Sequence, residues 1–305
     1  MTMQMFPRRW PVLVLLCVAA LCAGCGSSAD NDQAPVTVTV TSTGSNPSTV
    51  SVSSSSAPSS VPAGNYRTLS TGFARVAQQT GAIVGIAIAP IGGAAVPALT
   101  LGDRQSRVAW STIKVPLAVA AERKNGQSSA ETAAIVNSDN ASAESLWASL
   151  GSSSQAAAAV TAVLREGGDA TTVVPAQQLR AGFTIFGQTQ WALPDAATFT
   201  AHLPCMPGTE HVLSLMGQVA GNQQWGVEIM RAPRSTAVKG GWGPGDASGY
   251  LVRQIGIITH RNGKQTAIAM SAVGGSMSGG IAALNAVANW LGRNISRLPQ
   301  GSCAR

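Results

Sequence analysis

The feature that most limits how this chain can fold is its single long apolar run, residues 10–21. Arg8 and Arg9 precede the run and small residues follow it, which is typical of a secretory signal. A polytopic membrane protein would need several such runs, so the sequence excludes that class. Because 45% of the residues are hydrophobic and only 11% are charged, a wholly disordered chain is excluded as well.

The apolar run ends in Cys-Ala-Gly-Cys at residues 22–25. Small residues directly before a cysteine resemble the bacterial lipobox, in which that cysteine is acylated after cleavage. The resemblance implies a lipoprotein signal peptide over residues 1–24, and a lipid on Cys25 that holds the protein to the extracytoplasmic side of the cell membrane. Cys22 stands where an aliphatic residue is more usual, so an ordinary signal cut nearby, without lipid, is the alternative.

Residues 26–65 hold 17 Ser or Thr in 40 positions, no Lys or Arg, and only two acidic residues. Such a composition cannot bury a core, so we expect residues 25–65 to form a flexible tether that starts at the acylated cysteine. Residues 66–305 remain for one domain, which is long enough to bury a substantial core.

Charge and residue spacing exclude several kinds of partner. The formal charge is +7, but the basic residues are scattered singly without interleaved aromatics, which argues against nucleic-acid binding. The glycine-rich residues 240–245 precede a predicted strand and not a helix, so they do not fit a dinucleotide loop. His202, His211 and His260 show no metal-ligand spacing. We therefore expect no cofactor and no metal site.

Cys205 and Cys303 remain once the signal segment and Cys25 are set aside. In an exported protein two leftover cysteines usually pair, so we expect a disulfide between them, with free thiols as the alternative.

Hydrophobic periodicity predicts helices in the middle of the domain and strands at both ends. The expected helices cover residues 68–79, 110–124, 130–150, 154–166, 194–203, 210–219 and 279–292, with a long loop at 167–193. The expected strands cover residues 83–88, 235–242, 250–259 and 265–273, with a hairpin turn at Asn262-Gly263. This order indicates an α+β fold whose sheet is completed by the N- and C-terminal segments.

Three short patterns carry the candidate chemistry: Ser111-Thr112-Ile113-Lys114, Ser138-Asp139-Asn140 and Lys239-Gly240-Gly241. Residues three apart on a helix share a face, so the amine of Lys114 would lie beside the Ser111 hydroxyl. A lysine crowded by other cations can lose its proton and act as a base. The alternative is a helix cap at Ser111 without chemistry.

In this order and in these element types, the three patterns resemble the class A serine β-lactamase and penicillin-binding superfamily. The resemblance extends over residues 68–292 and includes Gly168-Asp169 ahead of an omega-type loop. It implies an antiparallel sheet flanked by helices, with a central helical lobe.

The resemblance also implies a role for each matching position. Ser111 would be the acylated nucleophile and Lys114 its base, with Ser138 passing the proton to the leaving nitrogen. Asn140 would steady Lys114 and hold substrate, and Lys239 would supply positive charge beside Ser138.

Three further positions complete the implied site. The backbone N–H groups of Ser111 and Trp242 would form the oxyanion hole, and Gly240 and Gly241 would contact substrate.

The chain departs from the family's pattern at positions that bear on turnover. Gln178 falls near the place of the loop glutamate that activates the deacylating water, and an amide cannot accept a proton at neutral pH. Glu166 ends the preceding expected helix and Asp195 begins the next, so these two acids are the candidates to substitute for it, although their spacing supports neither. Gly240 lacks the hydroxyl that grips a substrate carboxylate, and bulky Trp242 would crowd the strand edge. Only 24 residues separate the first motif lysine from the second motif serine.

Three loop aromatics, Phe183, Phe186 and Trp191, are either walls of the cleft or core residues under the loop. Arg253 is a candidate for a carboxylate-binding arginine, although the strand register is open at this point.

Two functional hypotheses follow. The first is a membrane-anchored serine acyl-enzyme, poor as a β-lactamase, that acts on a cell-wall peptide or a small ester or amide. The second is a catalytically degenerate binding or scaffold lipoprotein of the cell envelope. An acylable Ser111 distinguishes the first from the second.

Overall fold

The computed structural model describes residues 61–93, 97–245 and 248–304. Cys25, the expected signal peptide and most of the expected tether lie outside these residues. The first described helix, α1 (Ala63–Thr80), begins three residues before the expected domain start at residue 66. Among the described residues, no helix combines the length and the apolar character that crossing a membrane requires.

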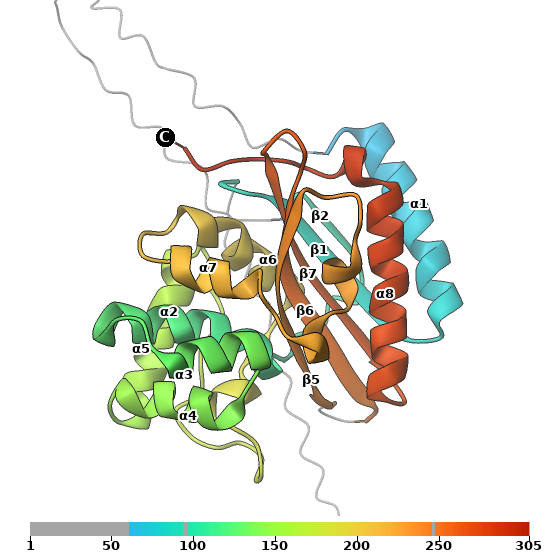
Figure 1. Cartoon of the computed structure of the whole chain (residues 1–305). Coiled ribbons are helices and arrows are strands. Elements are labelled where there is room, and N and C mark those ends of the chain that lie inside the picture. The colour runs from blue at the N-terminus through green and yellow to red at the C-terminus, as the bar shows by residue number, and fades with distance from the viewer. Residues whose placement is uncertain (1–60, 94–96, 246–247, 305) are drawn as a thin grey trace, which may run out of the picture. The chain divides into compact units, whose positions relative to one another are not determined.

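A five-stranded antiparallel sheet forms the centre of the domain, with the strand order β2-β1-β7-β6-β5 (Figure 1). β1 comes from the N-terminal part of the domain and pairs with β7 from the C-terminal part, which confirms the α+β prediction. The five strands are β1 (Ile83–Pro90), β2 (Leu99–Gly102), β5 (Ser235–Pro244), β6 (Tyr250–Thr259) and β7 (Gln265–Gly274).

The two faces of the sheet differ in the size of their side chains. Large aliphatic residues of β1 and β7 face α1 and α8 (Met277–Arg293), and together they form one buried cluster. Alanines alternate with them and face the helices on the other side, where α6 (Leu193–His202) packs against the sheet. Small side chains let this helix approach closely. The alanines are Ala87, Ala89, Ala267 and Ala269.

A helical lobe covers the sheet face opposite α1 and α8 (Figure 1). A short antiparallel pair, β3 (Arg107–Val108) and β4 (Gln190–Trp191), connects the lobe to the sheet. The lobe consists of α6 together with α2 (Lys114–Asn125), α3 (Ser129–Thr132), α4 (Asn140–Ser149), α5 (Ser153–Glu166) and α7 (Glu210–Met216).

Most expected elements are present, but their boundaries differ in places. The helix expected over residues 130–150 is divided into α3, a π-helical segment (Ala133–Asn137) and α4. β1 extends two residues beyond the strand expected over residues 83–88 and ends at Pro90. The prediction missed β2 and the β3–β4 pair, because strands of two to four residues are too short to show a period.

Buried side chains hold the long loop after α5 in place. Asp169 is fully buried, and its two carboxylate oxygens accept the backbone N–H of Thr172 at 2.9 Å and the indole N–H of Trp191 at 2.9 Å. Further along, the amide of Gln188 donates to the carbonyl of Phe183 at 3.1 Å. Hydrogen bonds of the buried side chains Asp169 and Gln188 therefore hold both ends of the loop in place.

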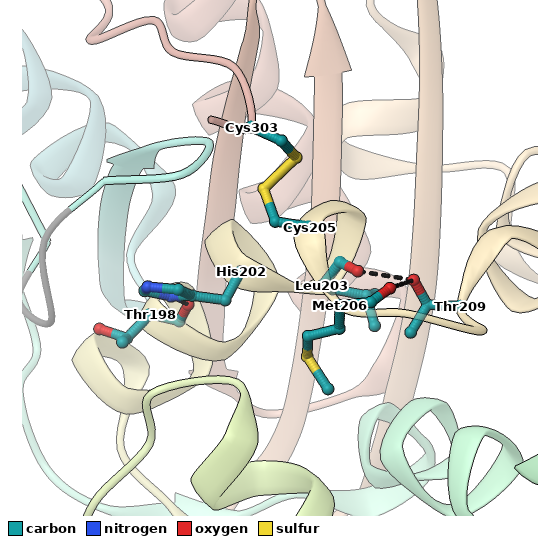
Figure 2. The surroundings of a disulfide bond; sticks show 7 residues. All are labelled: Thr198, His202, Leu203, Cys205, Met206, Thr209 and Cys303. Atoms are coloured by element: carbon teal, nitrogen blue, oxygen red, sulfur yellow. Dashed lines mark hydrogen bonds between the residues drawn. A yellow bond between two sulfur atoms is a disulfide. The ribbon is translucent and has the colours of Figure 1, made fainter. Parts of the chain in front are cut away.

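The expected disulfide between Cys205 and Cys303 is present (Figure 2). Cys205 ends the 3₁₀ turn after α6, and Cys303 lies near the C-terminus, with the two Cα atoms 5.3 Å apart. Beside the bond, the hydroxyl of Thr209 donates to the carbonyls of Leu203 at 2.7 Å and Met206 at 2.9 Å, which holds the turn in shape. The C-terminal segment is thus fixed covalently to the helical lobe.

Candidate active site

Lys114 joins the first motif to the second. It is the first residue of α2 and follows directly on the 3₁₀ turn Trp110–Ile113, which carries Ser111. Its fully buried Nζ donates to the carbonyls of Ser138 at 2.7 Å and Asp139 at 3.1 Å, and to Oδ1 of Asn140 at 2.7 Å. Within the described part of the chain, no hydrogen bond links this amine to the Ser111 hydroxyl. The amine expected beside the Ser111 hydroxyl is therefore hydrogen-bonded to the second motif instead.

The residue before the candidate nucleophile has a strained backbone. Trp110 has φ of +47°, a region that bulky residues rarely adopt. Its ring contacts Phe183 edge-on, with centroids 5.0 Å apart. A Cβ at Gly243 would lie 2.6 Å from the same ring, so only glycine fits there. Strain of this kind costs about 1–3 kcal/mol and persists only where the surroundings enforce it. Here it fixes the turn that presents Ser111.

The second motif forms the junction between the π-helical segment and α4. Ser138 has φ of +59°, which turns the chain at the end of that segment. Asp139 then caps α4, because its Oδ1 accepts the backbone N–H of Ser142 at 2.7 Å. This cap is the main cause that lowers the pKa of the Asp139 carboxyl. Asn140 follows as the first residue of α4, which aims its side chain at Lys114.

The third motif reaches the second through Lys239 on β5. Its Nζ lies 2.9 Å from Oγ of Ser138, 2.5 Å from Oε1 of Gln223 and 3.0 Å from the carbonyl of Gly240. The amide nitrogen of Gln223 donates to the carbonyls of Ile135 and Val136, at 2.9 Å each. Buried Gln223 therefore connects β5 to the segment that leads into Ser138.

Burial weakens the charge of both lysines. The pKa of Lys114 is lowered to about 8, mainly by desolvation, while the carboxylates of Asp139 and Glu144 oppose the shift. The pKa of Lys239 is lowered well below its usual value, first by complete burial and then by the charge of Lys114. Because burial favours the neutral form of an amine, a lysine in this site can serve as a proton acceptor near neutral pH.

The edge of β5 faces the Ser111 turn. The N–H of Gly240 leaves the sheet toward Gln223 at 3.0 Å, so the N–H of Trp242, two residues on, projects from the same edge. Between them, a Cβ at Gly241 would lie 2.9 Å from the backbone nitrogen of Ser111. The two backbone donors expected in an oxyanion hole therefore lie on adjoining segments in close contact.

Trp225 explains why the third motif has glycine at its second position. A Cβ at Gly240 would lie 2.7 Å from Cζ2 of the Trp225 ring, so a serine or threonine does not fit there without displacing that ring. The Trp242 ring lies on the same face, edge-on to Trp225 with centroids 6.4 Å apart. Its side chain thus lies on the face opposite Lys239, where it contacts Trp225 and also borders a pocket.

A pocket of about 350 Å³ opens over these residues. Aromatic residues, glycines and a proline make up most of its lining, and Ser111, Ser138 and Asn140 contribute polar groups alongside Thr184 and the Tyr250 hydroxyl. No carboxylate lines it within the described residues. The remaining lining residues are Trp110, Gly182, Phe183, Trp242, Gly243 and Pro244.

The acids that were considered as substitutes for the loop glutamate are engaged elsewhere. Glu166 forms an ion pair with Arg123, whose Nη2 lies 3.0 Å from Oε1. Asp195 accepts the hydroxyl of Thr171 at 2.7 Å. Gln178 is exposed, and its amide nitrogen donates to a loop carbonyl at 2.8 Å. None of these three side chains lines the pocket.

The loop aromatics and Arg253, the remaining candidates, occupy different places in the structure. Of the loop aromatics, Phe183 lines the pocket, whereas Phe186 and Trp191 are fully buried in the core. Arg253 is buried away from the pocket, where Nη1 donates to the carbonyls of Val108 at 3.1 Å and Trp191 at 3.0 Å. Burial lowers its pKa to about 9. Arg253 therefore stabilises the β3–β4 connection and does not face a ligand.

Sequence reasoning missed Gln223 and Glu144. Gln223 lies in an irregular segment with no pattern that marks it as part of a site. Glu144 follows Asn140 by one helical turn, and this spacing could have placed its charge on the Lys114 side of α4.

Comparison with known proteins gives structural matches only. No protein-family model matches the chain, and no curated protein matches its sequence. Solved class A β-lactamase structures match nearly over their whole length. The fold is that of class A β-lactamases.

Three of these structures illustrate the match. A β-lactamase from Xanthomonas campestris has a TM-score of 0.57 at 19% identity, covering 76% of this chain and 98% of its own. One from Sphaerobacter thermophilus has a TM-score of 0.56 at 15% identity, covering 77% and 99%. An ancestral class A β-lactamase has a TM-score of 0.53 at 18% identity, covering 73% and 98%. At identities this low, the structural matches establish the β-lactamase fold alone, because one fold hosts many functions.

Proposed function

We propose that this protein is a serine acyl-enzyme with slow deacylation. Ser111 Oγ bonds to the carbonyl carbon of an amide or ester, and the bond from that carbon to the leaving nitrogen or oxygen breaks. The Ser111 proton passes to the neutral amine of Lys114. The Ser138 hydroxyl delivers a proton to the leaving atom and takes one up from the lysine ammonium beside it, so that the proton from Ser111 ends on the leaving atom and Lys114 is neutral again. Water later hydrolyses the ester on Ser111.

The observation that carries this proposal is the lysine–serine network. Nζ of Lys114 and Nζ of Lys239 both reach Ser138, one at its carbonyl and the other at its hydroxyl. A pKa of about 8 leaves part of the Lys114 population neutral at pH 7, as proton acceptance from Ser111 requires. Ser111 and Ser138 line the same pocket, so a bound carbonyl can meet both.

Slow deacylation follows from the polar groups near the pocket. The resemblance puts an amide, Gln178, where the family has its water-activating glutamate, and an amide does not take up a proton at neutral pH. Glu166 and Asp195 are held by other partners. The acyl-enzyme should therefore be hydrolysed more slowly than it forms, which makes the protein a poor β-lactamase.

The substrate should lack a carboxylate beside the scissile bond. The hydroxyl that would grip it is missing at Gly240, and Trp225 fills the space. Losing such a hydrogen bond to a charged group costs about 1.5–3 kcal/mol. Trp110, Phe183 and Tyr250 give the pocket an apolar wall instead. We favour a cell-wall peptide or a small ester or amide with an apolar substituent.

The binding or scaffold lipoprotein remains the second candidate, because one observation favours it. All three hydrogens of the Lys114 ammonium are donated to the second motif, and none to Ser111. A serine without a base would be unreactive.

Intact mass of the purified full-length protein distinguishes the two candidates. The protein is incubated with a penicillin and, separately, with a fluorophosphonate, alongside Ser111→Ala and the exposed-serine control Ser145→Ala. With the fluorophosphonate we expect a stable adduct on the parent and on Ser145→Ala, and none on Ser111→Ala. A penicillin carries a carboxylate beside its scissile bond, so its adduct should form on the same two proteins but more slowly. Rapid penicillin turnover without an adduct would contradict slow deacylation. No adduct with either reagent would favour the binding lipoprotein.

Membrane attachment is part of the same proposal. A lipid on Cys25 would hold the domain outside the cell membrane at the end of its tether. In the native host, Cys25→Ser should move the protein from the membrane fraction to the soluble fraction and abolish labelling with a palmitate analogue. Cys22→Ser should leave both unchanged. Membrane retention of Cys25→Ser would exclude a lipid anchor at this residue.

A further inference from the structure

Three ionisable side chains from three helices meet inside the helical lobe, apart from the pocket. They are Glu122 near the end of α2, Glu131 in α3 and His211 in α7. One ligand atom from each lies within 4.8 Å of the other two. Nδ1 of His211 is 3.2 Å from Oε1 of Glu131 and 3.7 Å from Oε2 of Glu122.

The cluster lacks enough donors for its carboxylates. Glu131 is 1% exposed, and its Oε2 is buried without a hydrogen-bond partner among the described residues. Oε2 of Glu122 is likewise buried and without a hydrogen bond in that part of the chain. A buried carboxylate oxygen without a donor is costly, and one imidazolium cannot serve two carboxylates fully. The two carboxylates therefore lack a positively charged partner in addition to His211.

We propose that Glu122, Glu131 and His211 bind a divalent transition-metal ion of the zinc type. Zinc takes imidazole nitrogen and carboxylate oxygen at about 2.0–2.2 Å in tetrahedral geometry, which separates neighbouring ligand atoms by roughly 3.4 Å. The separations of His211 Nδ1 from the two carboxylates, 3.2 Å and 3.7 Å, lie on either side of that value. A water molecule would complete the coordination.

The ligand types argue against the common alkaline-earth ions. Mg²⁺ and Ca²⁺ are bound by six or more oxygens, whereas this cluster offers two carboxylates and one imidazole. Imidazole with carboxylate suits zinc and its neighbours in the first transition row.

The position of the site suggests what the metal would do. Glu122 lies two helical turns after Lys114 on α2, and Glu131 lies on α3, just before the π-helical segment that leads into Ser138. A metal bound to both, and to α7 through His211, would clamp together the two segments that carry the candidate base and the proton relay. It would stabilise the lobe without touching the pocket.

The rival explanation is a proton in place of the metal. The pKa of Glu131 is raised to about 7, first by burial and then by the neighbouring Glu122 carboxyl. The two carboxyls could therefore share one proton beside His211. This alternative predicts no affinity for metal.

Metal titration of the full-length, untagged protein separates the two. Chelator-treated protein is titrated with Zn²⁺ by calorimetry, and with Co²⁺ while its visible absorption is followed. We expect one saturable equivalent, a Co²⁺ band typical of low coordination, and a higher unfolding temperature with Zn²⁺. His211→Ala and Glu122→Gln should each weaken binding by about tenfold or more.

His202→Gln is the matched control, since His202 lies on α6 and bonds to the carbonyl of Thr198 at 2.9 Å, away from the cluster (Figure 2). Its metal affinity should equal that of the parent. Circular dichroism of each variant verifies folding, and Glu131→Gln gives an independent check if one of the others unfolds. Absence of a saturable equivalent, or equal affinity in folded His211→Ala and Glu122→Gln, would overturn the proposal in favour of the shared proton.

Discussion

The Trp225 ring occupies the space that any side chain at Gly240 would need, with a Cβ there only 2.7 Å from Cζ2. The ring is itself nearly buried, and its indole N–H donates to the carbonyl of Asn222 at 2.9 Å. This contact links the missing hydroxyl of the third motif to a residue outside every motif. It also makes the loss of that hydroxyl testable as a packing effect.

Gly240→Ser should destabilise the protein by about 1–3 kcal/mol, because an inserted side chain must displace a buried ring. Urea unfolding measures the change. On its own, Trp225→Leu should destabilise the protein through the cavity it leaves. In the double variant, however, it should reduce the destabilisation caused by Gly240→Ser. Additive effects in this cycle would show that the two residues do not compete for space.

Acylation of Ser111 should accelerate with pH. Lys114 accepts the proton only as a neutral amine, and its pKa of about 8 means that the neutral fraction rises through that pH. We expect the fluorophosphonate labelling rate to climb roughly tenfold per unit below pH 8 and to level off above it. Lys114→Met should remove the slope together with most of the rate. A flat profile in the parent would exclude Lys114 as the base.

Gln223→Leu should cost at least about 2 kcal/mol and also slow acylation. The substitution keeps the approximate shape but leaves the buried N–H of Gly240 without its acceptor. It also removes a donor from the carbonyls of Ile135 and Val136, although Val136 keeps its bond from the backbone N–H of Ala220. It also removes an acceptor from Lys239. Urea unfolding and labelling rates measure the two effects.

Gln224→Leu is the control for that variant, since Gln224 is exposed and its side-chain amide donates to the carbonyl of Val219 at 3.1 Å, outside the site. Its stability should stay within about 0.5 kcal/mol of the parent. Equal stability of both variants would mean that the Gln223 bridge is not needed.

Removing the disulfide should lower stability by about 4–5 kcal/mol on the loop-entropy model, because it closes a separation of 98 residues. The double variant Cys205→Ser/Cys303→Ser should unfold at lower urea than the parent. Reductant should shift the parent to the same midpoint and leave the double variant unchanged. If reductant opens the bond but leaves the urea midpoint of the parent unchanged, the cross-link adds no stability.

The sequence predicted well what depends on local spacing. Periodicity predicted the long helices and the three C-terminal strands, because each spans enough residues to show a period. The three motifs identified Ser138, Asn140 and Lys239 as neighbours of the first motif, and the structure brings these side chains to one pocket and its floor. Whether they perform the implied chemistry stays a prediction.

What the sequence could not predict depends on tertiary contacts. Trp225 meets Gly240 only after an irregular segment folds back on β5. Likewise, His211 has no acidic residue at metal-ligand spacing, because its two carboxylate neighbours come from helices about 80 residues earlier in the chain. Arg253 depends on strand register, which places it opposite Gly241.

The pairing of β1 with β7 also bears on how the chain is made. Gly85 lies opposite Ser271, so an inner strand of the sheet waits for a partner that is synthesised near the end of the chain. Until then β1 presents an apolar edge with free backbone groups, and such an edge is a template for aggregation. Contacts this distant in sequence also fold slowly. A nascent or truncated chain that lacks β7 should therefore depend on chaperones to stay in solution.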